Sequence, residues 1–192
     1  MSRVIAETER LILREWGEGD GDRFYDIMNT PAVMRYLGGI QEKADWDSAV
    51  GRITGYQRDD GHTFWLVERK GDRELLGFCG LKRVNHPGAS CTGDFEVGWR
   101  LREDAWGQGY AKEAAIASID LAFHRFGAPH VVALTVPGNA SSQGLMTRLG
   151  MVRREDLDFV DPRYPHPGDF NPAIVYRIEA ADWPSARASA LV

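Results

Sequence analysis

Two glycines separated by one residue, Gly107 and Gly109, mark the stretch of this chain whose chemistry is easiest to recognise. They lie between a run typical of a strand and a run typical of a long helix. Glycine has no Cβ, so successive backbone amides can face a bound anion, and a helix N-terminus adds about half a positive charge. We therefore predict a pyrophosphate-binding loop; the alternative is a glycine turn that only redirects the chain. The loop residues are Trp106, Gly107, Gln108, Gly109, Tyr110 and Ala111.

Motifs that would specify other phosphate or catalytic chemistry are absent from the sequence. There is no G-x-x-x-x-G-K-[ST] string, which disfavours a nucleoside triphosphatase. Lys112 stands where a dinucleotide-binding loop has its third glycine, and antiparallel strands are expected before the loop. No G-x-S-x-G elbow supports a serine hydrolase, and the five histidines lack metal-ligand spacing. We therefore expect no metal.

Composition narrows the class of protein without naming a function. The 192 residues suit one domain, which we place at residues 1–192. A formal charge of −5 makes nucleic acid an unfavoured partner. Two cysteines without C-x-x-C spacing fit a reducing compartment, and we find neither a signal peptide nor an apolar stretch of about 20 residues. We expect a cytoplasmic protein without membrane contact, as a monomer or homodimer.

The elements expected around the loop alternate between strands and helices. Residues 10–14 predict a first strand, and Asp20 or Asp22 can begin a helix. A second helix contains Trp46 to Tyr56, which Asp45 can cap, and Gly61 lies past its end. The further strands expected are 63–67 and 75–81, joined as a hairpin, then 95–101, 130–136 and 174–178. Helices are expected from Lys112 to a stop at Gly127, and from Asn139 to Leu149. This order predicts a mixed α/β sheet.

The loop resembles the acyl-CoA loop, Q/R-x-x-G-x-G/A, of the GNAT superfamily of N-acetyltransferases, in the RimJ/RimL-like branch that acetylates ribosomal-protein N-termini. The resemblance covers almost the whole chain: Thr8–Arg14, Glu96–Trp99, Asn139–Ser142 and Leu149–Met151 also match. Trp106 replaces the Gln or Arg of the general pattern, which leaves amide binding intact. Met151 replaces a usual Phe of similar volume.

The resemblance implies a fold and a cosubstrate. The fold would be a mostly antiparallel sheet with a splayed central strand pair and helices on both faces. Acetyl-CoA would be the cosubstrate, with its pantetheine arm paired to an exposed strand edge. That edge would be Val97, Gly98, Trp99 and Leu101. Two explanations of the glycine at position 98 stay open, a β-bulge in the strand or close packing against a neighbour.

The resemblance also assigns catalytic candidates. Glu96 would be the base that takes a proton from the amine, the alternative being a strand carboxylate facing solvent. Ser142 would donate a hydrogen bond to the sulfur of the leaving thiolate, and Asn139 would contact the pantetheine arm or the local turn, although both residue types also cap helices. Tyr176 and Tyr164 are alternative donors. An acceptor-side wall is expected at residues 161–171, with Tyr164, His166, Asp169 and Phe170.

These residues predict direct attack of an amine on acetyl-CoA. An α-amine with a pKa of about 8 is roughly a tenth neutral at pH 7, whereas a lysine side chain is almost wholly charged. A protein N-terminus is therefore the favoured acceptor. An aminoglycoside, polyamine or amino acid stays open as the acceptor, and so does a non-catalytic acyl-CoA-binding module.

Overall fold

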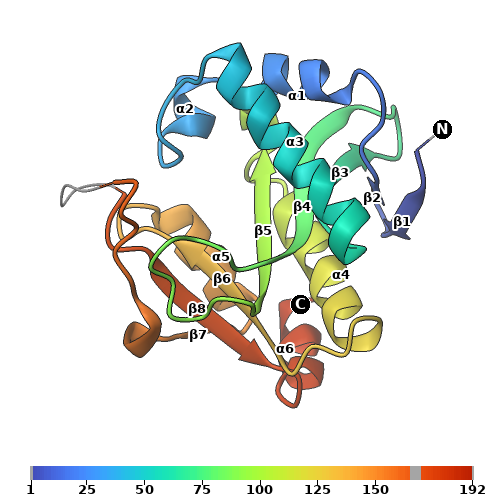
Figure 1. Cartoon of the computed structure of the whole chain (residues 1–192). Helices are drawn as coiled ribbons and strands as arrows, with labels where there is room; N and C mark the ends of the chain where they lie inside the picture. Colours follow the sequence, from blue (N-terminus) through green and yellow to red (C-terminus); the bar gives the residue numbers. More distant parts are fainter. Residues whose placement is uncertain (1, 165–169, 192) are drawn as a thin grey trace. The chain divides into compact units, whose positions relative to one another are not determined.

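The computed structural model describes residues 2–164 and 170–191, which form two compact units. The first contains residues 1–82 and 98–118, and the second contains residues 83–97 and 119–192. Three elements run from one unit into the other: strands β4 (Leu75–Arg83) and β5 (Phe95–Leu101) and helix α4 (Tyr110–His124) (Figure 1). The single domain expected over residues 1–192 stays a prediction.

Four antiparallel strands form the sheet of the first unit. They are β1 (Val4–Glu7), β2 (Leu11–Arg14), β3 (Phe64–Arg69) and β4, and each pairs with the next. The predicted hairpin is confirmed: Phe64 is opposite Gly80, and the Arg69 amide bonds to the Glu74 carbonyl 2.9 Å away across the turn. The turn includes Arg73, with a φ of 61°. The first predicted strand is β2, preceded by β1, which the sequence did not indicate.

Helices cover both faces of β3 and β4 within the first unit. On one face, α1 (Asp20–Met28), α2 (Pro31–Met34) and α3 (Lys43–Asp60) supply a core that includes Phe24, Met34 and Trp46. Phe78 of β4 packs into that core. The next residue, Cys79, points the opposite way, as strand geometry requires, and its Sγ lies 3.6 Å from Ser118 Oγ of α4. Burial raises the pKa of Cys79 to about 12.

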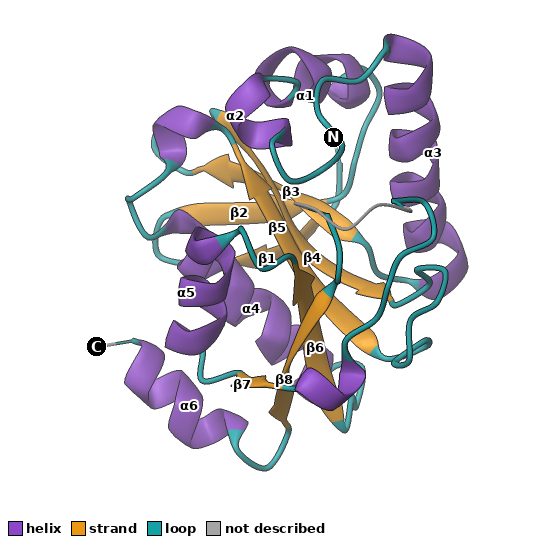
Figure 2. Cartoon of the chain, turned by 90° about the vertical axis from the view of Figure 1, so that its left-hand side faces the viewer, coloured by secondary structure: helices purple, strands orange, loops and turns teal. Residues whose placement is uncertain are grey.

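The second unit contains the one parallel strand pair among the described residues. β5 pairs with β6 (His130–Thr135) at Phe95 with Val131 and at Glu96 with Val132. β8 (Ile174–Glu179) lies antiparallel between β6 and β7 (Val152–Arg153). The helical elements of this unit are α5 (Ala140–Arg148), α6 (Trp183–Ala190), η2 (Glu155–Leu157) and residues 119–124 of α4 (Figure 2). A 3₁₀ turn, η1 (Glu103–Ala105), belongs to the first unit.

The two sides of β6 and β8 meet different partners. Val132 and Val175 pack with Val84 and Phe159 in one apolar cluster. The neighbour of Val175, Tyr176, faces the other way, and its hydroxyl donates to Gln143 Oε1 of α5 over 3.3 Å.

The expected mixed α/β fold is confirmed: residues 2–164 and 170–191 contain eight strands, mostly antiparallel, and six α-helices. The splay of the central pair stays a prediction. One expected helix start is wrong, because α3 has Glu42 at its N-cap rather than Asp45, which lies inside the first turn. Gly61 ends α3 with a φ of 74°, as expected.

Candidate functional site

The glycine loop has the backbone conformation that only glycine adopts without strain. Gly107 has a φ of 71° and Gly109 a φ of 80°, and helix α4 begins directly afterwards at Tyr110. The Trp106 amide bonds to the Glu103 carbonyl at 3.1 Å, and the Glu113 amide to the Gly109 carbonyl at 3.0 Å. Among the described residues, the six amides from 107 to 112 have no hydrogen-bond acceptor. They are available to an anion.

Side chains on both flanks of the loop hold its ends. The Trp106 indole donates to the Leu101 carbonyl over 2.7 Å, and the Gln108 side chain donates to the Asp104 carbonyl over 2.6 Å. These bonds tie the loop to the end of β5 and to η1. Trp106 nevertheless leaves half of its surface exposed.

Arg10, which the sequence did not single out, braces the loop from β1–β2. Its Nη1 donates to the Gln108 carbonyl over 2.9 Å, its Nε donates to Glu113 Oε2 over 2.7 Å, and its guanidinium lies 4.6 Å from the centre of the Tyr110 ring. Thr8 donates to Glu113 Oε1 over 2.5 Å. Burial opposes ionisation of Glu113, but the bonds from Thr8 and Arg10 lower its pKa below the ordinary value. The sequence clue that could have pointed to Arg10 was its place within Thr8–Arg14, the segment that resembles the first strand of GNAT proteins.

The strand-edge residues expected beside a pantetheine arm belong to β5. Val97 and Leu101 are buried, while Gly98 and Trp99 are partly exposed. A Cβ on Gly98 would lie 2.8 Å from the Phe64 ring. Close packing against that ring therefore accounts for the glycine.

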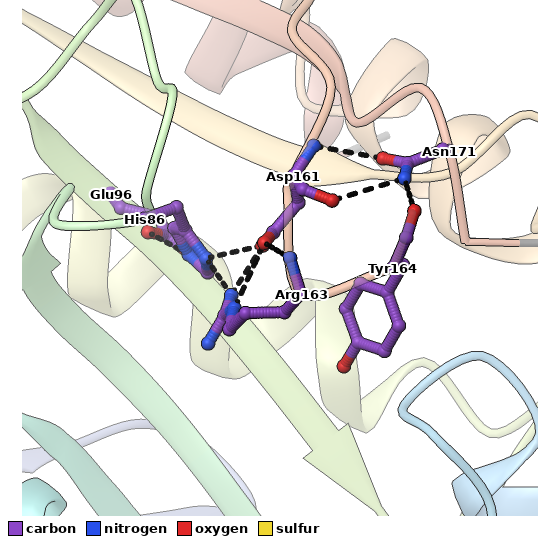
Figure 3. A network of polar contacts seen from close by, with 6 residues as sticks. All are labelled: His86, Glu96, Asp161, Arg163, Tyr164 and Asn171. Atoms are coloured by element: carbon purple, nitrogen blue, oxygen red, sulfur yellow. Dashed lines mark hydrogen bonds and ion pairs between the residues drawn. The ribbon is translucent and has the colours of Figure 1, made fainter. Parts of the chain in front are cut away.

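Glu96 is buried, with 7% of its surface exposed, so the interpretation as a carboxylate facing solvent is wrong. Figure 3 shows the network around it. His86 Nε2 lies 3.4 Å from Glu96 Oε2, and Arg163 Nη2 lies 2.9 Å from His86 Nδ1. A guanidinium only donates, so His86 Nδ1 accepts and the Nε2–H faces Glu96. Glu96 has a further polar interaction beyond this network.

Asp161, which is buried, belongs to the same network and contacts both His86 and Arg163. Its Oδ2 lies 3.9 Å from His86 Nδ1, and its Oδ1 accepts from Arg163 Nε over 3.0 Å. The bond from Arg163 lowers the pKa of Asp161 despite burial. The backbone amide of Asp161 donates to Asn171 Oδ1 over 2.9 Å, and the side-chain Nδ2 of Asn171 donates to the Tyr164 carbonyl (Figure 3).

The expected acceptor-side wall is described in part. Tyr164 and Phe170 stack with their ring centres 5.1 Å apart. His166 and Asp169, also expected there, lie outside the described residues.

Asn139 and Ser142 stand at the start of α5. Asn139 is the N-cap, and its Oδ1 accepts from the Ser142 amide over 3.2 Å. The capping interpretation of Asn139 is therefore confirmed, and the coenzyme contact stays a prediction. Tyr176, an alternative proton donor, already has its hydroxyl engaged with Gln143.

Two negative findings concern the described part of the chain. It contains no group of three or more His, Cys, Asp or Glu side chains that could hold a metal ion. None of its helices has the length and apolar character of a membrane span.

Comparison with known proteins identifies the chain as an acetyltransferase and gives its family. The Acetyltransferase (GNAT) domain model matches residues 10–152, so the chain belongs to the GNAT family of N-acetyltransferases. "Uncharacterized N-acetyltransferase YoaA" of Bacillus subtilis is 27% identical over 150 residues, covering 76% of this chain and 81% of that protein.

Solved structures share the fold. An acetyltransferase from Agrobacterium tumefaciens, 27% identical, superposes with a TM-score of 0.74 over 93% of this chain and 96% of that one. The "putative ribosomal-protein-serine acetyltransferase" from Vibrio cholerae is 18% identical, with a TM-score of 0.70 over 90% of this chain and 95% of that one. At that identity the likeness shows the fold alone.

Proposed function

We propose that this acetyltransferase transfers the acetyl group of acetyl-CoA to a protein N-terminal α-amine. The observation that carries the proposal is the run of six amides, Gly107 to Lys112, without an acceptor in the described residues, at the start of α4. Such a run is suited to the diphosphate of coenzyme A. Arg10 Nη1 donates to the Gln108 carbonyl over 2.9 Å and so helps to orient the peptide that carries the Gly109 amide.

In this proposal the pantetheine arm pairs with the edge formed by Val97, Gly98, Trp99 and Leu101, and Asn139 contacts it near α5. Trp106, Gln108, Tyr110 and Ala111 complete the diphosphate loop. The amide groups of the arm can form hydrogen bonds with the backbone N–H and C=O groups of a strand edge, as an added peptide strand does.

Glu96 serves as the base in the proposed chemistry. The amine nitrogen attacks the thioester carbonyl, the C–N bond forms, and the amine proton passes to the Glu96 carboxylate, directly or through water. The C–S bond then breaks while the Ser142 hydroxyl donates a hydrogen bond to the leaving thiolate, and the proton taken up by Glu96 passes to solvent water, which restores the carboxylate. His86 supports the role of Glu96, because its Nε2 lies 3.4 Å from Glu96 Oε2 and forms part of the polar surroundings of the carboxylate.

An N-terminal acceptor fits a site with a single carboxylate base. An α-amine is already roughly a tenth neutral at pH 7, so it needs far less deprotonation than a lysine side chain. The RimJ/RimL-like sequence pattern supports the same acceptor class.

Thiol release from acetyl-CoA tests the proposal. The acceptors would be a peptide with a free N-terminus, the same peptide N-terminally blocked but carrying lysine, spermidine and an aminoglycoside. We expect turnover with the first alone. Turnover with only a small amine would overturn the N-terminal acceptor, and binding without any turnover would overturn catalysis. Binding is measured by thermal unfolding, since ligand at 100 times its Kd adds about 2.7 kcal/mol.

A further inference from the structure

Arg100 of β5 is a partly buried arginine whose neighbours do not compensate its positive charge. Its Nη1 lies 3.8 Å from the Met34 sulfur, and its guanidinium carbon lies 5.2 Å from the centre of the Phe78 ring and 5.9 Å from that of Trp46. Its Nε is buried without a hydrogen-bond partner. Among the described residues, no carboxylate forms an ion pair with it.

These neighbours compensate the charge poorly. A guanidinium has five N–H donors, and a thioether sulfur is a weak acceptor. Aromatic faces within about 6 Å attract the cation but do not accept its N–H groups in the plane. Burial lowers the pKa of Arg100 to about 10, so the side chain is still charged at neutral pH.

Arg14 of the same unit shows how the chain treats a structural buried arginine. Arg14 donates to both oxygens of Asp20, at 2.7 and 2.9 Å, and to Glu68 Oε1 at 2.6 Å. Two carboxylates thus satisfy one guanidinium. Burial of an arginine is tolerated when its charge is paired in this way, and Arg100 lacks the pairing.

We propose that Arg100 binds an oxyanion, a carboxylate or phosphate, carried by the acceptor close to its amine. This inference rests on the proposed function and adds that the acceptor is acidic. The planar guanidinium suits two parallel hydrogen bonds to such a group. The side chain is partly exposed, so a ligand can reach it. Its neighbours come from α2, α3 and β4, whereas the donors proposed for the coenzyme diphosphate are the amides of the glycine loop.

The test compares two peptides that differ only in Glu or Gln at the second position, with a second pair carrying phosphoserine or serine there. Thiol release gives kcat/KM for each peptide. We expect the wild type to prefer the anionic member of a pair at least tenfold, and Arg100→Met to use both members equally. The pair with the larger preference identifies carboxylate or phosphate. Arg100→Lys, which keeps the charge but loses the planar fork, should retain part of the preference.

Several results would overturn the inference. Equal use of the paired peptides by the wild type would do so, as would a preference kept in Arg100→Met. A rise in KM for acetyl-CoA matching the loss of peptide selectivity would assign Arg100 to the coenzyme instead. Circular dichroism and thermal unfolding check the fold, and Arg100→Met should unfold no earlier than the wild type because it removes an uncompensated charge. If Arg100→Met does not fold, Arg100→Lys and Arg100→Gln take its place.

A wild type that turns over no peptide would refute the proposed function by itself. The anion site is then decided by thermal unfolding in sodium acetate or sodium phosphate against sodium chloride of equal ionic strength. Stabilisation of the wild type that Arg100→Met lacks supports an oxyanion site, and identical shifts in both proteins refute it.

Discussion

Gly109→Asp should weaken coenzyme A binding through the charge that it introduces beside the loop amides. A Cβ at Gly109 lies 3.3 Å from Arg10 Nη2, so the new side chain starts against the brace of the loop. A unit negative charge about 5 Å from a phosphate costs about 1 kcal/mol in water and about 3 kcal/mol at the effective dielectric of a protein surface. The expected loss of affinity is therefore roughly five- to 150-fold, and smaller in high salt.

Isothermal titration with coenzyme A measures this effect, and two variants separate its causes. Gly109→Asn has nearly the same shape without the charge, and Asn tolerates a positive φ as well as Asp does. Gly127→Asp places the same residue at a glycine with a φ of 63° and no atom within 4 Å of its Cβ, beyond the other end of α4. Acetyl-pantetheine, which lacks the diphosphate, should bind all variants alike. If Gly109→Asp and Gly109→Asn bind coenzyme A equally, the loop does not hold the diphosphate.

Three other perturbations follow from the same structure. Glu96→Gln should lower kcat by about 10²–10⁴-fold with little change in acetyl-CoA affinity, measured by steady-state kinetics; an unchanged kcat would remove Glu96 as the base. Ser142→Ala should reduce turnover while the melting temperature holds; equal rates would leave it a structural residue. Arg14→Met should cost about 3–5 kcal/mol in urea unfolding, because Asp20 and Glu68 lose their shared cation. Burial favours the protonated form of Asp20, but the bond from Arg14 lowers the pKa of this carboxyl below its ordinary value. The stabilisation is therefore present above about pH 4 and is lost progressively as the pH falls below it. A difference in unfolding free energy between wild type and variant that is unchanged at pH 3 would contradict the pairing.

Elements with strong periodicity or clear stop signals were predictable from the sequence. Helix α4 was expected from its apolar spacing and from Gly127, and the β3–β4 hairpin from its turn residues. The elements not foreseen are short or rich in small residues. They are β1, α2, β7 and α6. In a two-residue strand or a four-residue helix, tertiary contacts decide the conformation and periodicity has no room to show.

The candidate site divides in the same way. The loop was visible because its two glycines are close in sequence and their conformational role is local. The network around Glu96 was not visible, since His86 and Arg163, which bond to each other, are 77 positions apart and meet only through the fold. Arg100 gave no sequence signal either, because an unpaired charge is defined by what surrounds it.

Cys79, enclosed between β4 and α4, has a practical consequence for assays of this enzyme. A thiol whose pKa is raised to about 12 is almost entirely protonated near neutrality, and only thiolates react readily with disulfide reagents. Cys91, the other cysteine, is buried as well. Colour developed by an aromatic disulfide reagent in a reaction mixture should thus come from released coenzyme, and any contribution from the polypeptide would signal that its interior has opened.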